Sequence, residues 1–215
     1  MKSVAFIAVD ILRKRSGDGS LISTPRQHIR ALANSISDPE LRAQRIFFGE
    51  PPYAFRDKLD KAFDIKQRVS EHFQCDFRSV AFCGSAHLGF SPTKDTSFLA
   101  GSSDLDVALI DTSLFQMTWK QLVEYSKAFN DLTVFGSEPA ASRKVNDIHV
   151  MLAKRGVLHL HNMPRGDIFD KDREFLRRIS RDYADMFGEI TISFYMNEYA
   201  FSWKQDSCIQ QILRD

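Results

Sequence analysis

Cysteine is scarce in this sequence, with three residues in a chain of 215. Cys75, Cys83 and Cys208 are odd in number, and their spacing does not match that of metal ligands. A disulfide framework and a cysteine-based zinc site are therefore excluded. We expect the three thiols to be reduced and mostly buried, as in a cytosolic protein.

Net charge and long apolar runs are also lacking. The formal net charge is only +1, so no global field attracts nucleic acid, and a long polyanion would need a local basic patch. This balance does not exclude a mononucleotide substrate. The apolar stretch from Val4 to Val9 is interrupted by Asp10, which makes it too short for a membrane span, and no signal cleavage pattern follows. We predict a cytoplasmic protein with no membrane partner.

The composition is that of an ordinary globular protein, with 43% hydrophobic and 27% charged residues. Eighteen phenylalanines predict a core rich in aromatic packing. The length suits one domain, or one domain with an appended subdomain. We expect a compact core over residues 76–215 and an N-terminal helical and strand region, residues 1–75, that packs on it.

Strand-like and helix-like segments alternate along the chain. Strand patterns occur at 80–82, 107–110, 157–161 and 190–197. Helix patterns occur at 55–73, 113–129, 140–154, 170–187 and in the tail to 215, and a further helix begins after the capping residue Thr24. This alternation predicts an α/β (α+β) fold, a mixed sheet flanked by helices.

The most informative stretch joins a Gly-Ser pair to a pair of carboxylates. Gly84 and Ser85 follow an apolar run, and a helix can begin there, so their backbone N–H groups would favour a triphosphate anion. Asp104 and Asp106 are two residues apart, so on a β-strand their side chains point to the same face. Two divalent cations shared by such a pair, about 4 Å apart, can clamp the attacking and leaving oxygens of a phosphoryl displacement.

Each half of this pattern is weak evidence by itself. A Gly-Ser pair after a strand is common, and Asp-x-Asp at a strand edge is often simply solvated. The two halves occur here in order and with strand-like flanks, and together they resemble the nucleotidyltransferase superfamily related to DNA polymerase β. The superfamily signature is filled by Cys83-Gly84-Ser85 and Asp104-Leu105-Asp106, with Ser103 before the first aspartate. The resemblance covers roughly residues 78–111 and identifies no subfamily, and the spacer at 90–100 is longer than in most members.

The resemblance implies a metal-dependent nucleotidyltransferase that moves a nucleoside monophosphate from a nucleoside triphosphate such as ATP to an acceptor. Asp104 and Asp106 would be the catalytic, Mg²⁺-binding (or Mn²⁺-binding) residues, and Gly84 and Ser85 would bind the nucleotide phosphates. Acceptors in the superfamily include a protein side chain, a tRNA end, a second nucleotide and a small molecule. The short tail after the last strand favours a compact bacterial toxin or defence component over a template-directed polymerase.

A third carboxylate usually lies on the strand beside the Asp-x-Asp strand in this superfamily. Carried over by position, that strand is 157–161, and its centre is His159. Three interpretations stay open. His159 completes the metal site as a nitrogen ligand, or Asp147 or Glu198 supplies the carboxylate, or the chain is a catalytically weak nucleotide-binding or regulatory relative.

Overall fold

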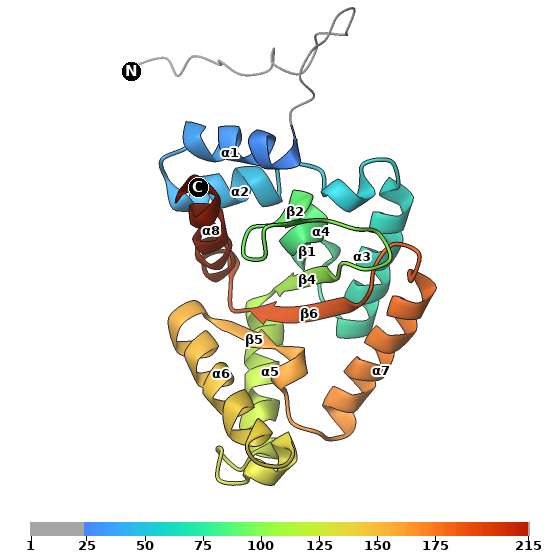
Figure 1. Ribbon diagram of the computed structural model, residues 1–215. Helices are drawn as coiled ribbons and strands as arrows, with labels where there is room; N and C mark the ends of the chain where they lie inside the picture. The colour runs from blue at the N-terminus through green and yellow to red at the C-terminus, as the bar shows by residue number, and fades with distance from the viewer. Residues whose placement is uncertain (1–23, 215) are drawn as a thin grey trace, which may run out of the picture.

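The computed structural model describes residues 24–214, in which a mixed four-stranded sheet is flanked by helices (Figure 1). The α-helices are α1 (Pro25–Ser35), α2 (Pro39–Phe47), α3 (Leu59–Phe73), α4 (Gly84–Leu88), α5 (Thr112–Tyr125), α6 (Ala140–Arg155), α7 (Asp167–Asp182) and α8 (Glu198–Arg214). The strands are β1 (Val80–Cys83), β2 (Phe90–Ser91), β3 (Thr96–Ser97), β4 (Leu105–Ile110), β5 (Val157–His159) and β6 (Ile190–Tyr195). Four 3₁₀ helices complete this part of the chain, η1 (Tyr53–Phe55), η2 (Phe77–Ser79), η3 (Leu132–Phe135) and η4 (Leu160–Asn162). The predicted α/β (α+β) class is confirmed.

The main sheet has the strand order β1-β4-β6-β5. Strand β4 pairs antiparallel with β1 and parallel with β6, and β5 pairs antiparallel with β6. A parallel pair requires a long crossover connection, and the chain from α5 to α7 supplies it. In this register Asp106 lies opposite Cys83 on one side and opposite Thr191 on the other. The two central strands therefore join residues that are far apart in the sequence.

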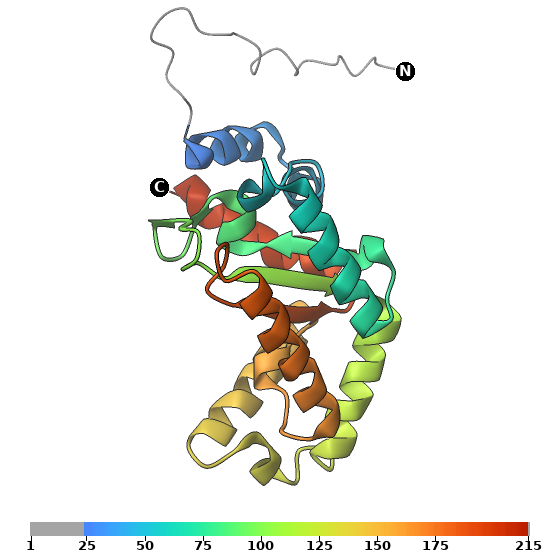
Figure 2. The ribbon, with the colours of Figure 1, turned by 90° about the vertical axis from the view of Figure 1, so that its right-hand side faces the viewer.

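The sheet separates two hydrophobic cores. One core contains Phe82, Val107 and Phe194 together with apolar residues of α3, α5, α6 and α7. The other contains Ala108 and Tyr195 together with apolar residues of α1, α2 and α8. Neighbours along β4, such as Val107 and Ala108, point to opposite cores because side chains alternate along a strand. Both ribbon views show α1, α2 and α8 near one end of the molecule and α5, α6 and α7 near the other (Figures 1 and 2).

Side-chain caps mark the starts of α1, α2 and α5. Thr24 and Gln27 form a capping box at the start of α1, as its predicted capping role requires. Helix α5 is capped by Asp111, whose carboxylate accepts from the backbone N–H of Leu114. Helix α2 was not predicted, although Asp38 caps it and a proline follows at the first helical position.

The sequence patterns are least accurate in placing the ends of helices and strands. The predicted helix 113–129 stops at Tyr125, because residues 127–129 have positive φ. The predicted strand 157–161 stops at His159 and continues as η4. The helix predicted from Phe55 begins at Leu59, after the short turn η1. The apolar stretch from Val4 to Val9 lies outside the described residues.

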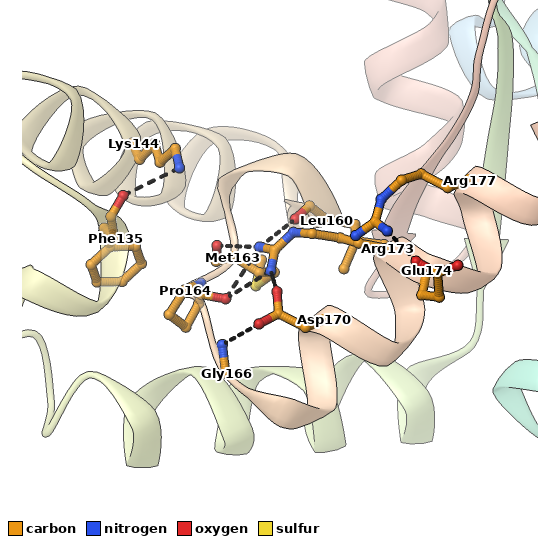
Figure 3. A network of polar contacts seen from close by, with 10 residues as sticks. All are labelled: Phe135, Lys144, Leu160, Met163, Pro164, Gly166, Asp170, Arg173, Glu174 and Arg177. Carbon is orange, nitrogen blue, oxygen red and sulfur yellow. Dashed lines mark hydrogen bonds and ion pairs between the residues drawn. The ribbon is translucent and has the colours of Figure 1, made fainter.

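Arg173 of α7 holds the connection that follows η4 (Figure 3). Its guanidinium donates to the carbonyl oxygens of Met163 at 2.5 Å and Pro164 at 3.1 Å, and it pairs with the carboxylate of Asp170 at 2.7 Å. A rigid planar group with five donors suits such a multiple contact. Arg173 thereby ties α7 to the segment that leaves β5.

Candidate functional site

The Gly-Ser turn meets the aspartate strand directly. Strand β1 ends at Cys83, opposite Asp106, and the chain then turns into the five-residue helix α4. Gly84 has φ +65°, and a Cβ added to it would lie 2.0 Å from Oδ2 of Asp106. A side chain at this position is excluded both by the left-handed backbone and by the carboxylate. Gly84 therefore presses its backbone against Asp106, with the half-buried Ser85 next in the chain.

The two aspartates differ in their surroundings. Asp106 lies on β4 and is half-buried, whereas Asp104 comes just before the strand and is exposed. The hydroxyl of Thr191 donates to Oδ1 of Asp106 at 2.9 Å. Burial raises the pKa of Asp106, the charge of Asp104 adds to the rise, and the Thr191 hydroxyl and the Lys204 ammonium oppose it. The two carboxylates thus act on each other, as their spacing predicts.

The strand beside β4 is β6, and not the strand at 157–161. Leu105 pairs with Ile190, and the Leu105 N–H donates to the carbonyl oxygen of Glu189 at 2.8 Å. Glu189 therefore stands at the entrance of β6, level with Asp104 at the entrance of β4. A Cβ added to Gly188 would lie 3.4 Å from Oδ1 of Asp104. The carboxylate just before the neighbouring strand is Glu189, a residue that the sequence patterns did not single out.

His159 lies one strand further away, on β5. Its Nδ1 is 2.7 Å from the hydroxyl oxygen of Ser193, its partner on β6. Burial, together with the nearby His161 and Lys204, lowers the pKa of His159 to about 4. The expectation that His159 occupies the strand beside Asp106 is therefore wrong, because β6 is inserted between β5 and β4.

Nearby carboxylates affect the pKa of His161. This histidine follows β5 in η4, and its ring lies 5.3 Å from that of His159. Burial lowers the pKa of His161, while the carboxylates of Asp147, Glu189 and Asp106 oppose the decrease. The carboxylates that act on this imidazole therefore come from three separate parts of the chain, α6, the entrance of β6 and β4.

The other two candidates for the third ligand are placed differently. Asp147 is exposed on α6, and its carboxylate acts on His161. Glu198 begins α8, beyond the opposite end of β6 from Glu189, and its carboxylate accepts from the side-chain amide of Gln44 at 2.9 Å. Glu198 therefore lies away from the entrance of β4.

Two lysines contribute positive charge near Asp106. Lys94 comes from the hairpin of β2 and β3 in the long spacer, and Lys204 comes from α8. Both lower the pKa of Asp106, and Lys204 also acts on Cys83. The sequence carried no signal for either lysine, because solvated lysines on loops and helices are common and only the tertiary fold places these two together.

Neither of the two main cavities lies at the aspartates. The larger, about 460 Å³, is lined by Gln44, Phe48, Arg78 and Glu198 among others. Asp104 and Glu189 are exposed, Asp106 is half-buried, and none of the three lines either cavity. Among residues 24–214, no group of three or more histidine, cysteine or acidic residues is close enough to hold a metal by itself. Mg²⁺ is commonly held by one or two carboxylates plus substrate phosphates, and the aspartate pair fits that mode.

Comparison of the chain with protein-family models, with curated proteins and with solved structures gave no match. Separately, no helix in the described part of the chain is both long and apolar enough to span a membrane.

Proposed function

We propose that this protein is a metal-dependent nucleotidyltransferase that uses a nucleoside triphosphate. The observation that carries the proposal is the contact of Gly84 with Asp106, where a Cβ would lie 2.0 Å from the carboxylate oxygen. It supports a nucleotide held with its phosphates at the Gly84-Ser85 turn and next to the carboxylates. In the superfamily that the sequence resembles, these two elements serve the same substrate.

The carboxylates would come from two neighbouring strands. Asp104 and Asp106 would hold Mg²⁺ or Mn²⁺, which when bound would neutralise phosphate charge and polarise the reacting phosphate. Glu189, level with Asp104, replaces His159, Asp147 and Glu198 as our candidate for the third carboxylate. Thr191 would orient Asp106 through its hydrogen bond of 2.9 Å. Lys94 and Lys204 would add positive charge beside the triphosphate.

A second function is favoured by one specific observation. Asp106 is buried enough that its pKa is raised, although the hydrogen bond from Thr191 opposes the rise. The burial disfavours an ionised, metal-ready carboxylate. A nucleotide-binding or regulatory relative with weak catalysis would have such a site.

The experiment that tests both functions is a titration of the full chain with a non-hydrolysable nucleoside triphosphate, with and without Mg²⁺ or Mn²⁺. Binding that requires the metal, together with pyrophosphate release from α-labelled triphosphates, is the expected result for the transferase. Binding that persists without metal and releases no pyrophosphate would establish the regulatory relative. No binding under either condition would refute both. The matched control is Asp57→Asn, which removes an exposed carboxylate elsewhere and is expected to change nothing.

A further inference from the structure

A second cavity, of about 330 Å³, lies beside the edge strand β1. Its walls are mostly apolar and come from the end of α2, the prolines that follow it, α3 and β1; they include Phe48, Pro52, Leu59, Ala62 and Phe82. The rim is exposed, with Leu59 61% and Phe48 47% accessible to solvent. Exposed apolar groups gathered around one concavity are typical of a binding site and not of a random surface.

Lys66 of α3 is the cation in this wall. Its ammonium lies 5.4 Å from the ring centroid of Phe82 and 5.7 Å from that of Phe77. Burial lowers the pKa of Lys66, and no other group contributes to the shift. Within residues 24–214, no carboxylate lies within ion-pair distance of its Nζ atom, and the two ring faces compensate only part of its lost hydration.

The one carboxylate of the cavity wall already has partners. Glu50 lies 3.1 Å from Nε2 of His28 and 2.5 Å from a guanidinium nitrogen of Arg45. Glu50 therefore pairs with His28 and Arg45, and no carboxylate of the cavity wall balances the charge of Lys66. Lys66 is half-buried, so its charge loses part of its hydration, and no counter-charge in the cavity wall compensates for that loss.

We propose that this cavity binds a medium-chain fatty acid, with the carboxylate on Lys66 and the chain against Phe48, Pro52 and Leu59. The volume lies near the lower end of the range for small-molecule sites, about 300–1,000 Å³. A single ammonium suits one carboxylate, and the apolar walls suit an alkyl chain. A nucleotide is a poor fit, because one cation cannot balance several phosphates. The site is separate from Asp104 and Asp106, so it does not depend on the proposed transferase function.

The test is calorimetric titration of the full chain with decanoate below its micelle concentration, and with decanamide as a neutral ligand of the same length. Wild-type protein is expected to bind decanoate saturably at one site. Lys66→Met is expected to weaken decanoate by at least about tenfold and to leave decanamide unchanged, because only the charged head group loses its partner. The matched control is Lys61→Met, which removes an exposed lysine of the same helix whose Nζ lies over the Tyr183 ring.

A second variant keeps the test decisive if Lys66→Met does not fold. Leu59→Asp places a negative charge at the exposed rim and is expected to weaken decanoate more than decanamide. The proposal is overturned if wild-type protein shows no saturable decanoate binding. It is equally overturned if Lys66→Met or Leu59→Asp binds decanoate like wild type, or if Lys61→Met loses as much affinity as Lys66→Met.

Discussion

The two ends of one sheet face have opposite characters. At one end, Val157 and Tyr195 pack into the core that α8 covers. At the other end, the same face carries Asp106 and Thr191, followed by the hydrogen-bonded pair of Ser193 and His159. Apolar residues would stabilise both ends equally well. A row of polar groups under a helix is costly in folding free energy, so the polar end is the part of the face that points to function and not to stability.

The comparison is tested most directly by substituting one residue at each end of this sheet face. Asp106→Asn is expected to reduce metal-dependent nucleotide binding by at least about 100-fold and to abolish transfer, because it removes an anionic ligand. Its melting temperature should hold or rise, because a carboxyl whose pKa is raised by burial is unfavourable when ionised. Asp104→Asn should also abolish transfer, with a smaller effect on stability because Asp104 is exposed.

The matching exchange at the apolar end is Val157→Ala. Val157 is fully buried, so the change should lower the free energy of unfolding by about 1–3 kcal/mol. Nucleotide binding should be retained. Calorimetry is expected to show a loss of stability in Val157→Ala but not in Asp106→Asn. Titration is expected to show a loss of nucleotide binding in Asp106→Asn but not in Val157→Ala. Near wild-type turnover in either aspartate variant would show that the polar end is not catalytic.

The next largest effect is expected from Gly84→Ala. The new Cβ would lie 2.0 Å from Asp106, so the turn or the carboxylate must move. We expect a loss of about 2–4 kcal/mol in the free energy of unfolding, combining backbone strain and steric overlap, and loss of nucleotide binding. Gly101→Ala is the matched control, because Gly101 has φ +73° but its added Cβ would meet nothing closer than 3.5 Å. Equal losses in denaturant titrations of the two variants would contradict the steric argument.

Thr191→Val tests the hydrogen bond from Thr191 to Asp106 at the polar end. Its expected effect on stability is smaller than that of Gly84→Ala. The variant keeps the shape but removes the hydroxyl that donates to Asp106, so the pKa of Asp106 should rise further. We expect the free energy of unfolding to decrease by about 1–2 kcal/mol at neutral pH. The loss should shrink as pH falls and Asp106 becomes protonated in both proteins. Thr118→Val, which removes a hydrogen bond within α5 to the Leu114 carbonyl, should show a loss that does not vary with pH in the same denaturation series.

The effect that is smallest at neutral pH belongs to His159, because it develops only as the solution is acidified. Its folded pKa is about 4, against about 6.5 when unfolded, so the folded state binds fewer protons between these values. Stability contributed by this group should therefore decrease as pH falls from 6.5 to 4, by at most about 1.4 kcal/mol per pH unit. His159→Gln should remove that part of the slope, and His149→Gln, an exposed histidine on α6, should not. An unchanged slope in His159→Gln would mean that His159 is not held neutral.

The sequence predicts the part of this site that is formed by residues close together in the chain. The sequence predicts that the Gly84-Ser85 turn and the strand of the two aspartates serve one site, and the structure shows that the antiparallel pairing of β1 with β4 brings them together. The rest of the site depends on which later strand lies beside β4. The segments 157–161 and 190–197 both have strand patterns, and nothing in their residues says which one is central.

Tertiary packing decides that choice, and the consequences are long-range. Strand β6 is flanked on both sides and β5 only on one, so the neighbouring carboxylate is Glu189 and not a residue of the earlier strand. Gly188 lies against Asp104. Lys204 lies on a helix whose pattern predicted only a helical tail. These residues become neighbours of Asp104 or Asp106 through the fold and not through spacing.

The insertion of β6 between two earlier strands also sets when the site can exist during synthesis. The contact between Cys83 and Asp106 spans 23 positions, whereas the one between Asp106 and Thr191 spans 85. At a translation rate of about 5–20 residues per second, the second contact becomes possible roughly 4–17 seconds after Asp106 has been made. During that interval only the contact of Gly84 with Asp106 can form. The edge of β4 that later pairs with β6 is unpaired and can pair with other strands. The site is therefore incomplete until Glu189 and β6 have been made.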